Sequence, residues 1–262
     1  MKKIWIGFGL ACVLSLAGCG GGNPPETAKK AEPGAAPAGG GAAAMPDEAN
    51  GATITGKVTF DGTKPKGKTI DMSANPVCTK AHATAPAMTE DVVVNDNGTL
   101  KYAFVWIKSG LPDQTWQVPT TAVTLDQNGC MYKPHVIGVM AGQQIDVKNS
   151  DPTNHNIHPQ PQTNQEWNES QPPGSADKMQ TFARQEVMIP VKCNIHPWMR
   201  SYIGVVSHPF FAVTGDDGTF TIKGLPPGTY TIEAWHEKYG TSDQTITVGA
   251  KDSKTQDFSF KG

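Results

Sequence analysis

Residues 193–199 read Cys-Asn-Ile-His-Pro-Trp-Met, and residues 155–158 upstream read His-Asn-Ile-His. The first stretch places a thiolate, an imidazole and a thioether in one short segment, and the second can supply another imidazole from a distant strand. Two His, one Cys and a weakly bound axial Met are the ligands of mononuclear electron-transfer copper sites. We therefore predict one copper ion, cycling between Cu(I) and Cu(II), on four ligands: His155, Cys193, His196 and Met199.

Two other readings of these residues stay open. A zinc site could combine Cys193 and His196 with His155 and His158, but zinc would leave Met199 without a role. Alternatively, Cys193 could be an inert buried residue near surface histidines. A dinuclear copper centre with two bridging thiolates is excluded, because the loop contains a single Cys.

From residue 52 onward the sequence predicts short β-strands. Alternating apolar residues are interrupted by Gly, Pro and Asn-Gly turns, which is typical of antiparallel β-sandwiches. A helical turn is expected around 76–84. The expected strands are 52–60, 92–95, 99–107, 122–125, 136–140, 144–149, 185–193, 202–206, 211–214, 219–223, 230–234 and 244–248.

The C-terminal part resembles a known β-sandwich. Asp216-Asp-Gly-Thr-Phe-Thr-Ile222, followed by Gly224-Leu-Pro-Pro-Gly-Thr-Tyr230, reads as strand, tight turn and strand. This is similar to the second half of the carboxypeptidase regulatory-like, transthyretin-like sandwich. Gly56-Lys-Val-Thr-Phe-Asp-Gly62 resembles its first half.

Two all-β modules are therefore predicted. In a nested arrangement, residues 52–72 and 208–262 form the regulatory-like sandwich and residues 73–207 form the copper module between them. A tandem order, with 52–72 attached to the first module, is the alternative.

The copper module resembles the cupredoxin family, specifically its amicyanin-like and plastocyanin-like members. The resemblance covers about residues 120–207 and rests on His155 to His158 and on the Cys193-x-x-His-Pro-x-Met199 loop. It implies a Greek-key β-sandwich with type 1 (blue) copper, in which His158 is not a ligand. Asn156 is expected to join the two ligand segments by hydrogen bonds. Pro197 and Trp198 are expected to form a patch that docks a redox protein partner. The alternative is that Trp198 only covers the copper from water.

The chain has five cysteines. Cys12 lies in the apolar N-terminal segment, and Cys19 is a lipidation candidate. Cys78 and Cys130 remain as a candidate disulfide, which would suit an oxidising compartment. A second metal site involving the nearby His82 and His135 is the alternative.

The N-terminus predicts export and lipid attachment. Lys2 and Lys3 precede an apolar run that is too short to span a bilayer and reads as a signal peptide, residues 1–18. It ends in Leu-Ala-Gly-Cys19, which resembles a bacterial lipobox; an ordinary secretory cleavage is the alternative. Residues 19–51 are rich in Gly, Ala and Pro and predict a disordered tether.

We expect a lipoprotein on the periplasmic face of an envelope membrane. The outer membrane is preferred, because the residue after Cys19 is Gly20 and not the Asp that is commonly linked to retention in the inner membrane. The expected activity is one-electron transfer without enzymatic chemistry. Copper sequestration or delivery, or surface binding with structural copper, are the alternatives. The net charge of −2 gives no sign of a nucleic-acid partner.

Overall fold

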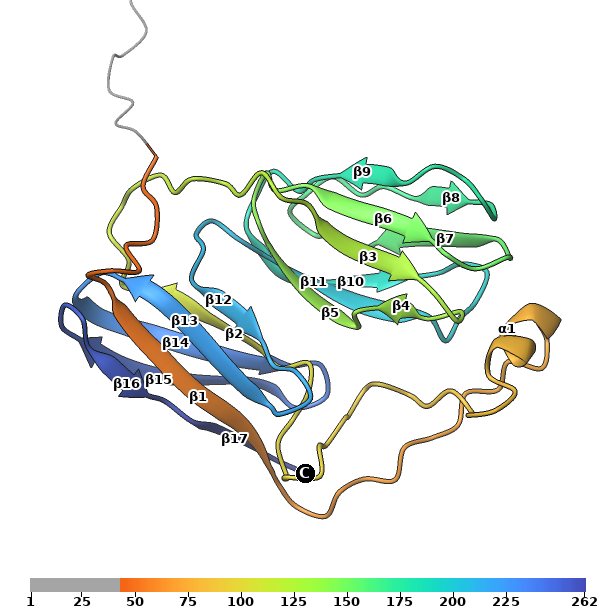
Figure 1. Ribbon diagram of the computed structural model, residues 1–262, viewed down its shortest axis with the longest axis horizontal. Helices are drawn as coiled ribbons and strands as arrows, with labels where there is room; N and C mark the ends of the chain where they lie inside the picture. The colour runs from red at the N-terminus through yellow and green to blue at the C-terminus, as the bar shows by residue number, and fades with distance from the viewer. Residues whose placement is uncertain (1–42) are drawn as a thin grey trace, which may run out of the picture. The chain divides into compact units, whose positions relative to one another are not determined.

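A computed structural model describes residues 43–262 (Figure 1). The predicted signal peptide, Cys19 and most of the predicted tether lie outside the described residues. The end of the tether differs from expectation: the Ala44 N–H donates to the Thr115 carbonyl at 2.8 Å, and Gln117 N–H donates to the Ala44 carbonyl at 2.8 Å. These backbone pairs order the chain before residue 52. Within 43–262, no helix has the length and apolar character needed to cross a membrane.

The first pair of sheets contains the N-terminal strand and the C-terminal strands of the described chain. In Figure 1, β1 runs beside β13 and β17, from the opposite end of the sequence. One sheet comprises β1 (Ala52–Asp61), β13 (Thr219–Leu225), β16 (Ser253–Thr255) and β17 (Phe258–Lys261). The other has the order β12 (Phe211–Val213), β2 (Phe104–Ser109), β14 (Gly228–His236) and β15 (Gly240–Val248).

One apolar core joins these two sheets into a sandwich. Ile54 of β1, Ile107 of β2 and Ile232 of β14 belong to it and have no exposed surface. Each such side chain stabilises the fold by about 1.5–3 kcal/mol through burial. The alternation of buried and exposed residues along β13 shows which face of this sheet meets the core.

The second pair of sheets forms the sandwich that carries the predicted metal ligands. Its core includes Leu125, Val147, Val191 and Ile203. One sheet has the order β5 (Val136–Met140), β11 (Arg200–Val206), β10 (Glu186–Lys192), β7 (His155–Pro159) and β8 (Glu169–Gln171). The other has the order β4 (Tyr132–Lys133), β3 (Val123–Gln127), β6 (Ile145–Asn149) and β9 (Lys178–Gln180).

Two sequence predictions about strands are wrong. The strand expected at 99–107 lies within the predicted copper module 73–207, but the strand that forms there, β2, pairs with β12 and β14 of the other sandwich. Residues 92–95 are not a strand: the turn at 96–98 forms, but only one bridge, Val94 to Leu100, follows it. Tyr102 then has a φ of 66°, which interrupts extended backbone before β2 begins. The other module boundaries stay predictions.

A short helix, α1 (Pro76–Ala81), lies within the expected helical turn. The Asn75 side chain accepts hydrogen bonds from the N–H groups of Val77 and Cys78, and Pro76 occupies the first helical turn. This is a favourable helix start, because Asn is a good N-cap and Pro needs no hydrogen-bond acceptor there.

His208, between β11 and β12, makes stability depend on pH. Its Nε2–H donates to the Ile107 carbonyl at 2.8 Å, and its Nδ1 accepts from the Phe210 N–H. Burial lowers the pKa of His208 to about 4 from 6.5, against the smaller raising effect of the Ile107 bond. The folded protein therefore holds His208 neutral, while the unfolded chain takes up a proton below pH 6.5.

The contribution of neutral His208 to the free energy of unfolding is therefore fully present above about pH 6.5. It is lost as the pH falls towards 4, and the total loss is about 3 kcal/mol. Urea unfolding of metal-free protein at pH 7 and pH 4.5 measures this loss. In His208→Gln the loss should be smaller by about 2–3 kcal/mol. An unchanged loss would contradict the assignment.

Candidate metal centre

His155 is the first residue of β7 and has no exposed surface. Its Nε2 lies 2.9 Å from Asp151 Oδ2, which leaves Nδ1 pointing at the Nδ1 atom of His196, 2.9 Å away. Asp151 also accepts the backbone N–H groups of Gly129 and Cys130, both at 2.7 Å. The carboxylate therefore fixes the orientation of the His155 ring, as outer partners of metal-binding histidines commonly do.

The loop from Cys193 to Met199 connects the paired strands β10 and β11. The Cys193 N–H donates to the Met199 carbonyl at 3.2 Å, and the Met199 N–H donates to the His196 carbonyl at 2.9 Å. The His196 N–H also donates to Cys193 Sγ at 3.4 Å. These bonds close the loop and hold Cys193 and His196 facing the same point.

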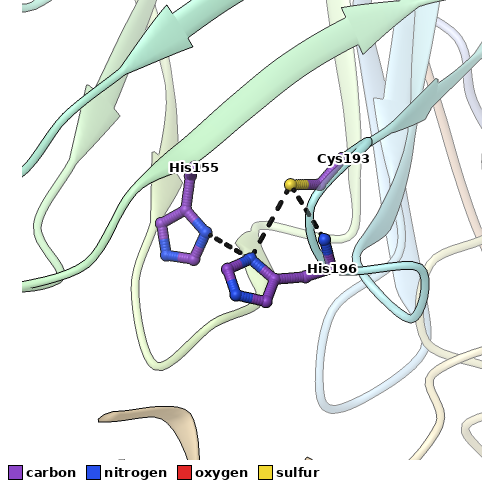
Figure 2. A group of neighbouring side chains, drawn as sticks. All are labelled: His155, Cys193 and His196. Atoms are coloured by element: carbon purple, nitrogen blue, oxygen red, sulfur yellow. Dashed lines mark hydrogen bonds between the residues drawn. The ribbon is translucent and has the colours of Figure 1, made fainter. Parts of the chain in front are cut away.

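His155, Cys193 and His196 converge, as Figure 2 shows. One ligand atom from each lies within 4.8 Å of the other two, with Cys193 Sγ 3.8 Å from His196 Nδ1. The three side chains are at most 3% exposed. Two imidazole nitrogens and a thiol sulfur in a buried cluster fit copper, which accepts both soft and borderline ligands.

Met199 belongs to the same core cluster as Cys193 and is fully buried. Its place in the loop is compatible with the predicted axial role, which stays a prediction. His158 lies on β7 beyond His155, and its Nε2 is bonded to Glu166, away from the cluster.

Asn156 joins the two ligand segments. Its Oδ1 accepts the Asn194 N–H at 2.6 Å and the Cys193 thiol at 3.3 Å, while its Nδ2 donates to Asn168 Oδ1 at 2.7 Å. The structure thus gives Asn156 the contacts that the sequence predicted for it.

The groups around Cys193 favour its thiolate, which is the form that binds metal. Burial raises the pKa of its thiol, but hydrogen bonds from His155 and from backbone N–H groups outweigh burial and leave this pKa below its usual 9.0. Burial, with the charge of His155, lowers the pKa of His196. For His155, burial lowers the pKa, but Asp151 and Cys193 outweigh burial and raise it. Metal binding requires a thiolate and neutral imidazoles, so the trends at Cys193 and His196 assist it.

Cys78 and Cys130 form a disulfide in the structure. Cys130 Sγ also lies within 4.8 Å of ligand atoms of Asp151 and His155, but a sulfur in a disulfide is not available as a thiolate ligand. The alternative second site is not formed: His82 Nε2 faces the Gly129 carbonyl, and His135 faces the Arg200 carbonyl and Glu237.

Trp198 covers part of the site. Its ring centroid lies 5.1 Å from that of His196, and its indole N–H donates to the Cys130 carbonyl at 3.0 Å. Trp198 is half-buried and Pro197 is exposed. The covering role of Trp198 is thus visible, while docking of a partner stays a prediction.

No pattern in the sequence indicated that Asp151 or Asn75 would contact the ligands. Asp151 lies in a loop four residues before His155. This spacing predicts a side-chain contact in a helix but not in a loop. Asn75 is 121 residues from His196, whose Nε2 it contacts at 2.8 Å. In neither case does a local pattern reveal the contact.

Asp151→Asn tests the carboxylate. We expect it to weaken Cu(I) binding about 10–100-fold, the usual effect of losing an outer partner of a ligand. Competition with a Cu(I) chelator measures the affinity. Asp126→Asn changes the same charge on β3 next to this region and should leave affinity unchanged. Equal affinities for the two variants would contradict the role of Asp151.

Comparison with known proteins adds a family for one part of the chain. Residues 205–261 match the model of the carboxypeptidase regulatory-like domain. A search of curated proteins found no match.

Three solved structures are similar to part of the chain. A Cu-containing nitrite reductase (NirK) from Thermus scotoductus SA-01 is 18% identical over 37% of this chain and 25% of its own length, with a TM-score of 0.31. A purple cupredoxin from Nitrosopumilus maritimus is 17% identical over 32% of this chain and 98% of its own, with a TM-score of 0.28. The Cu(I) form of an amicyanin mutant is 21% identical over 38% of this chain and 97% of its own, with a TM-score of 0.29. Residues 205–261 thus match the carboxypeptidase regulatory-like domain, and about a third of the chain is similar to solved cupredoxins.

Proposed function

We propose that this protein is a type 1 copper protein that transfers single electrons in the bacterial cell envelope. The observation that carries the proposal is the convergence of His155 Nδ1, His196 Nδ1 and Cys193 Sγ in a buried pocket. Copper bound there would exchange one electron at a time, and no substrate bond would be made or broken.

The residues around the cluster suit this task. Asp151 orients His155, and Asn156 ties Cys193 to β7. A site assembled by such contacts before metal arrives rearranges little when the charge of the metal changes. Pro197 and Trp198, beside His196, are our proposed contact for a redox protein partner.

Voltammetry of the copper-loaded full chain tests the function. Electron transfer predicts a reversible one-electron wave and no loss of copper over repeated cycles. A delivery protein would instead release Cu(I) to a chelator of modest affinity within minutes, and a sequestration protein would keep its copper without a reversible wave. An irreversible wave, with or without such release, would refute our proposal.

We also propose the lipid anchor, on the strength of the sequence before Cys19. The disulfide between Cys78 and Cys130 supports export, because such bonds persist in oxidising compartments. Cells fed a labelled fatty acid should label the parent protein and fail to label Cys19→Ser. Equal labelling of both would exclude Cys19 as the lipid site.

A further inference from the structure

Two cationic side chains stand where the ligand loop leaves and rejoins the sheet. Lys192, the last residue of β10, is directly opposite Arg200, the first residue of β11. Directly opposite residues of an antiparallel pair project from the same face of the sheet, so these side chains are neighbours. Arg200 is exposed and Lys192 is half-buried. The pair therefore places two like charges beside the candidate metal centre.

These two charges are not neutralised within the part of the chain that the structure describes. Neither Lys192 nor Arg200 lies within 4.0 Å of a carboxylate oxygen of residues 43–262. Arg200 borders a recess that contains carboxylates. Of these, Glu90 and Glu237 face His135 instead. Like charges directly opposite each other destabilise a sheet, so the pair opposes folding without an internal counter-charge.

A recess of about 380 Å³, here called the basic recess, connects this pair with the ligand loop. Lys192 and Arg200 line it together with Cys193, Asn194 and Pro197 of the loop. None of the described residues that line it carries a carboxylate. A molecule seated in the basic recess therefore meets two positive charges and lies next to a proposed copper ligand.

The charge of the basic recess is local. The whole chain has a net charge of −2, so attraction for anionic surfaces is not a general property of this protein. A partner that carries carboxylates at its own contact face complements the recess, and such complementarity steers association and fixes orientation. An anionic membrane surface would meet the same two charges, but it would offer no electron donor or acceptor at Cys193.

We propose that Lys192 and Arg200 dock an acidic patch of the redox protein partner over the basic recess. This inference rests on the proposed electron transfer and adds the chemistry of the partner surface. One electron passes between the partner and the copper in the docked complex, so that one of them is oxidised as the other is reduced, and no bond is made or broken.

Amide chemical shifts of the full chain, recorded before copper is added, test docking without electron transfer. The probe is cytochrome b5, a haem protein with an acidic surface. We expect it to shift the amides of Lys192, Asn194 and Arg200 at low salt. The shifts should disappear in about 1 M salt, where the Debye length falls to about 3 Å. Vesicles of phosphatidylglycerol should leave these amides unshifted.

Stopped-flow reduction of the Cu(II)-loaded full chain tests the consequence for electron transfer. Reduced cytochrome b5 gives one electron from its haem Fe(II), which leaves Fe(III) and Cu(I). The double variant Lys192→Gln, Arg200→Gln should slow this reaction about 10-fold at low salt. Hydroquinone, an uncharged reductant, should reduce the parent and the variant at equal rates, because the copper site itself is unchanged.

The double variant Lys57→Gln, Lys223→Gln removes the same charge from exposed positions of β1 and β13 and should react like the parent. Equal slowing in both double variants, slowing in neither, or amide shifts that appear only with the vesicles would overturn the docking surface and leave the copper site intact. A copper-loaded parent without a reversible wave would overturn the proposed function, while the amide shifts would still report on docking.

Discussion

Replacing Cys193 by Ala should lower Cu(I) affinity by more than about 100-fold, beyond the range expected for an outer partner such as Asp151. Cys193 supplies the one thiolate of the cluster, and two neutral imidazoles remain without it. Of the cysteines among residues 43–262, Cys193 is the free one, so no other described thiol can replace it. Chelator competition gives the affinity.

Ile195→Ala is the matched control for this substitution. Ile195 lies in the same loop but is 49% exposed, so its truncation changes the loop without removing a ligand. Its affinity should equal that of the parent. Cys193→Ala protein that binds Cu(I) as tightly as Ile195→Ala would show that the thiolate is not a ligand.

The double variant Cys78→Ser, Cys130→Ser should lose about 4 kcal/mol of stability. The bond links residues 52 positions apart, and closing a loop of that length removes about this much conformational freedom from the unfolded chain. Urea unfolding of the metal-free protein measures the loss. The variant also removes the covalent tie that holds α1 beside His196.

A reductant separates loss of the bond from damage by the new side chains. Adding a dithiol to the parent should reproduce most of the loss, whereas the double variant should not respond. A parent protein whose unfolding midpoint is insensitive to reduction would contradict a stabilising role for the disulfide.

The sequence predicted what depends on local pattern. Cys193 and His196 are three residues apart on one loop, so their chemistry could be seen without a structure. Alternation along β1 and the regulatory-like turns likewise predicted strands where they occur. Both sandwiches of the all-β fold follow from such signals.

What the sequence missed depends on pairing between distant segments. The strand β2 has four consecutive buried residues, so its pattern does not say which sheet it joins; β12 and β14 decide that. Asn75 could be identified as a helix cap, but not as the neighbour of a ligand. Such contacts arise only when the segment around Asn75 and the ligand loop fold together.

The visible spectrum of the full chain on addition of Cu(II) tests the central claim most directly. A thiolate bound to Cu(II) in a His₂Cys site gives the intense charge-transfer absorption of blue copper proteins. We predict an intense visible band that saturates at one equivalent of copper and disappears on reduction to Cu(I). A protein that stays colourless with Cu(II) and binds Zn(II) in preference would contradict the electron-transfer account.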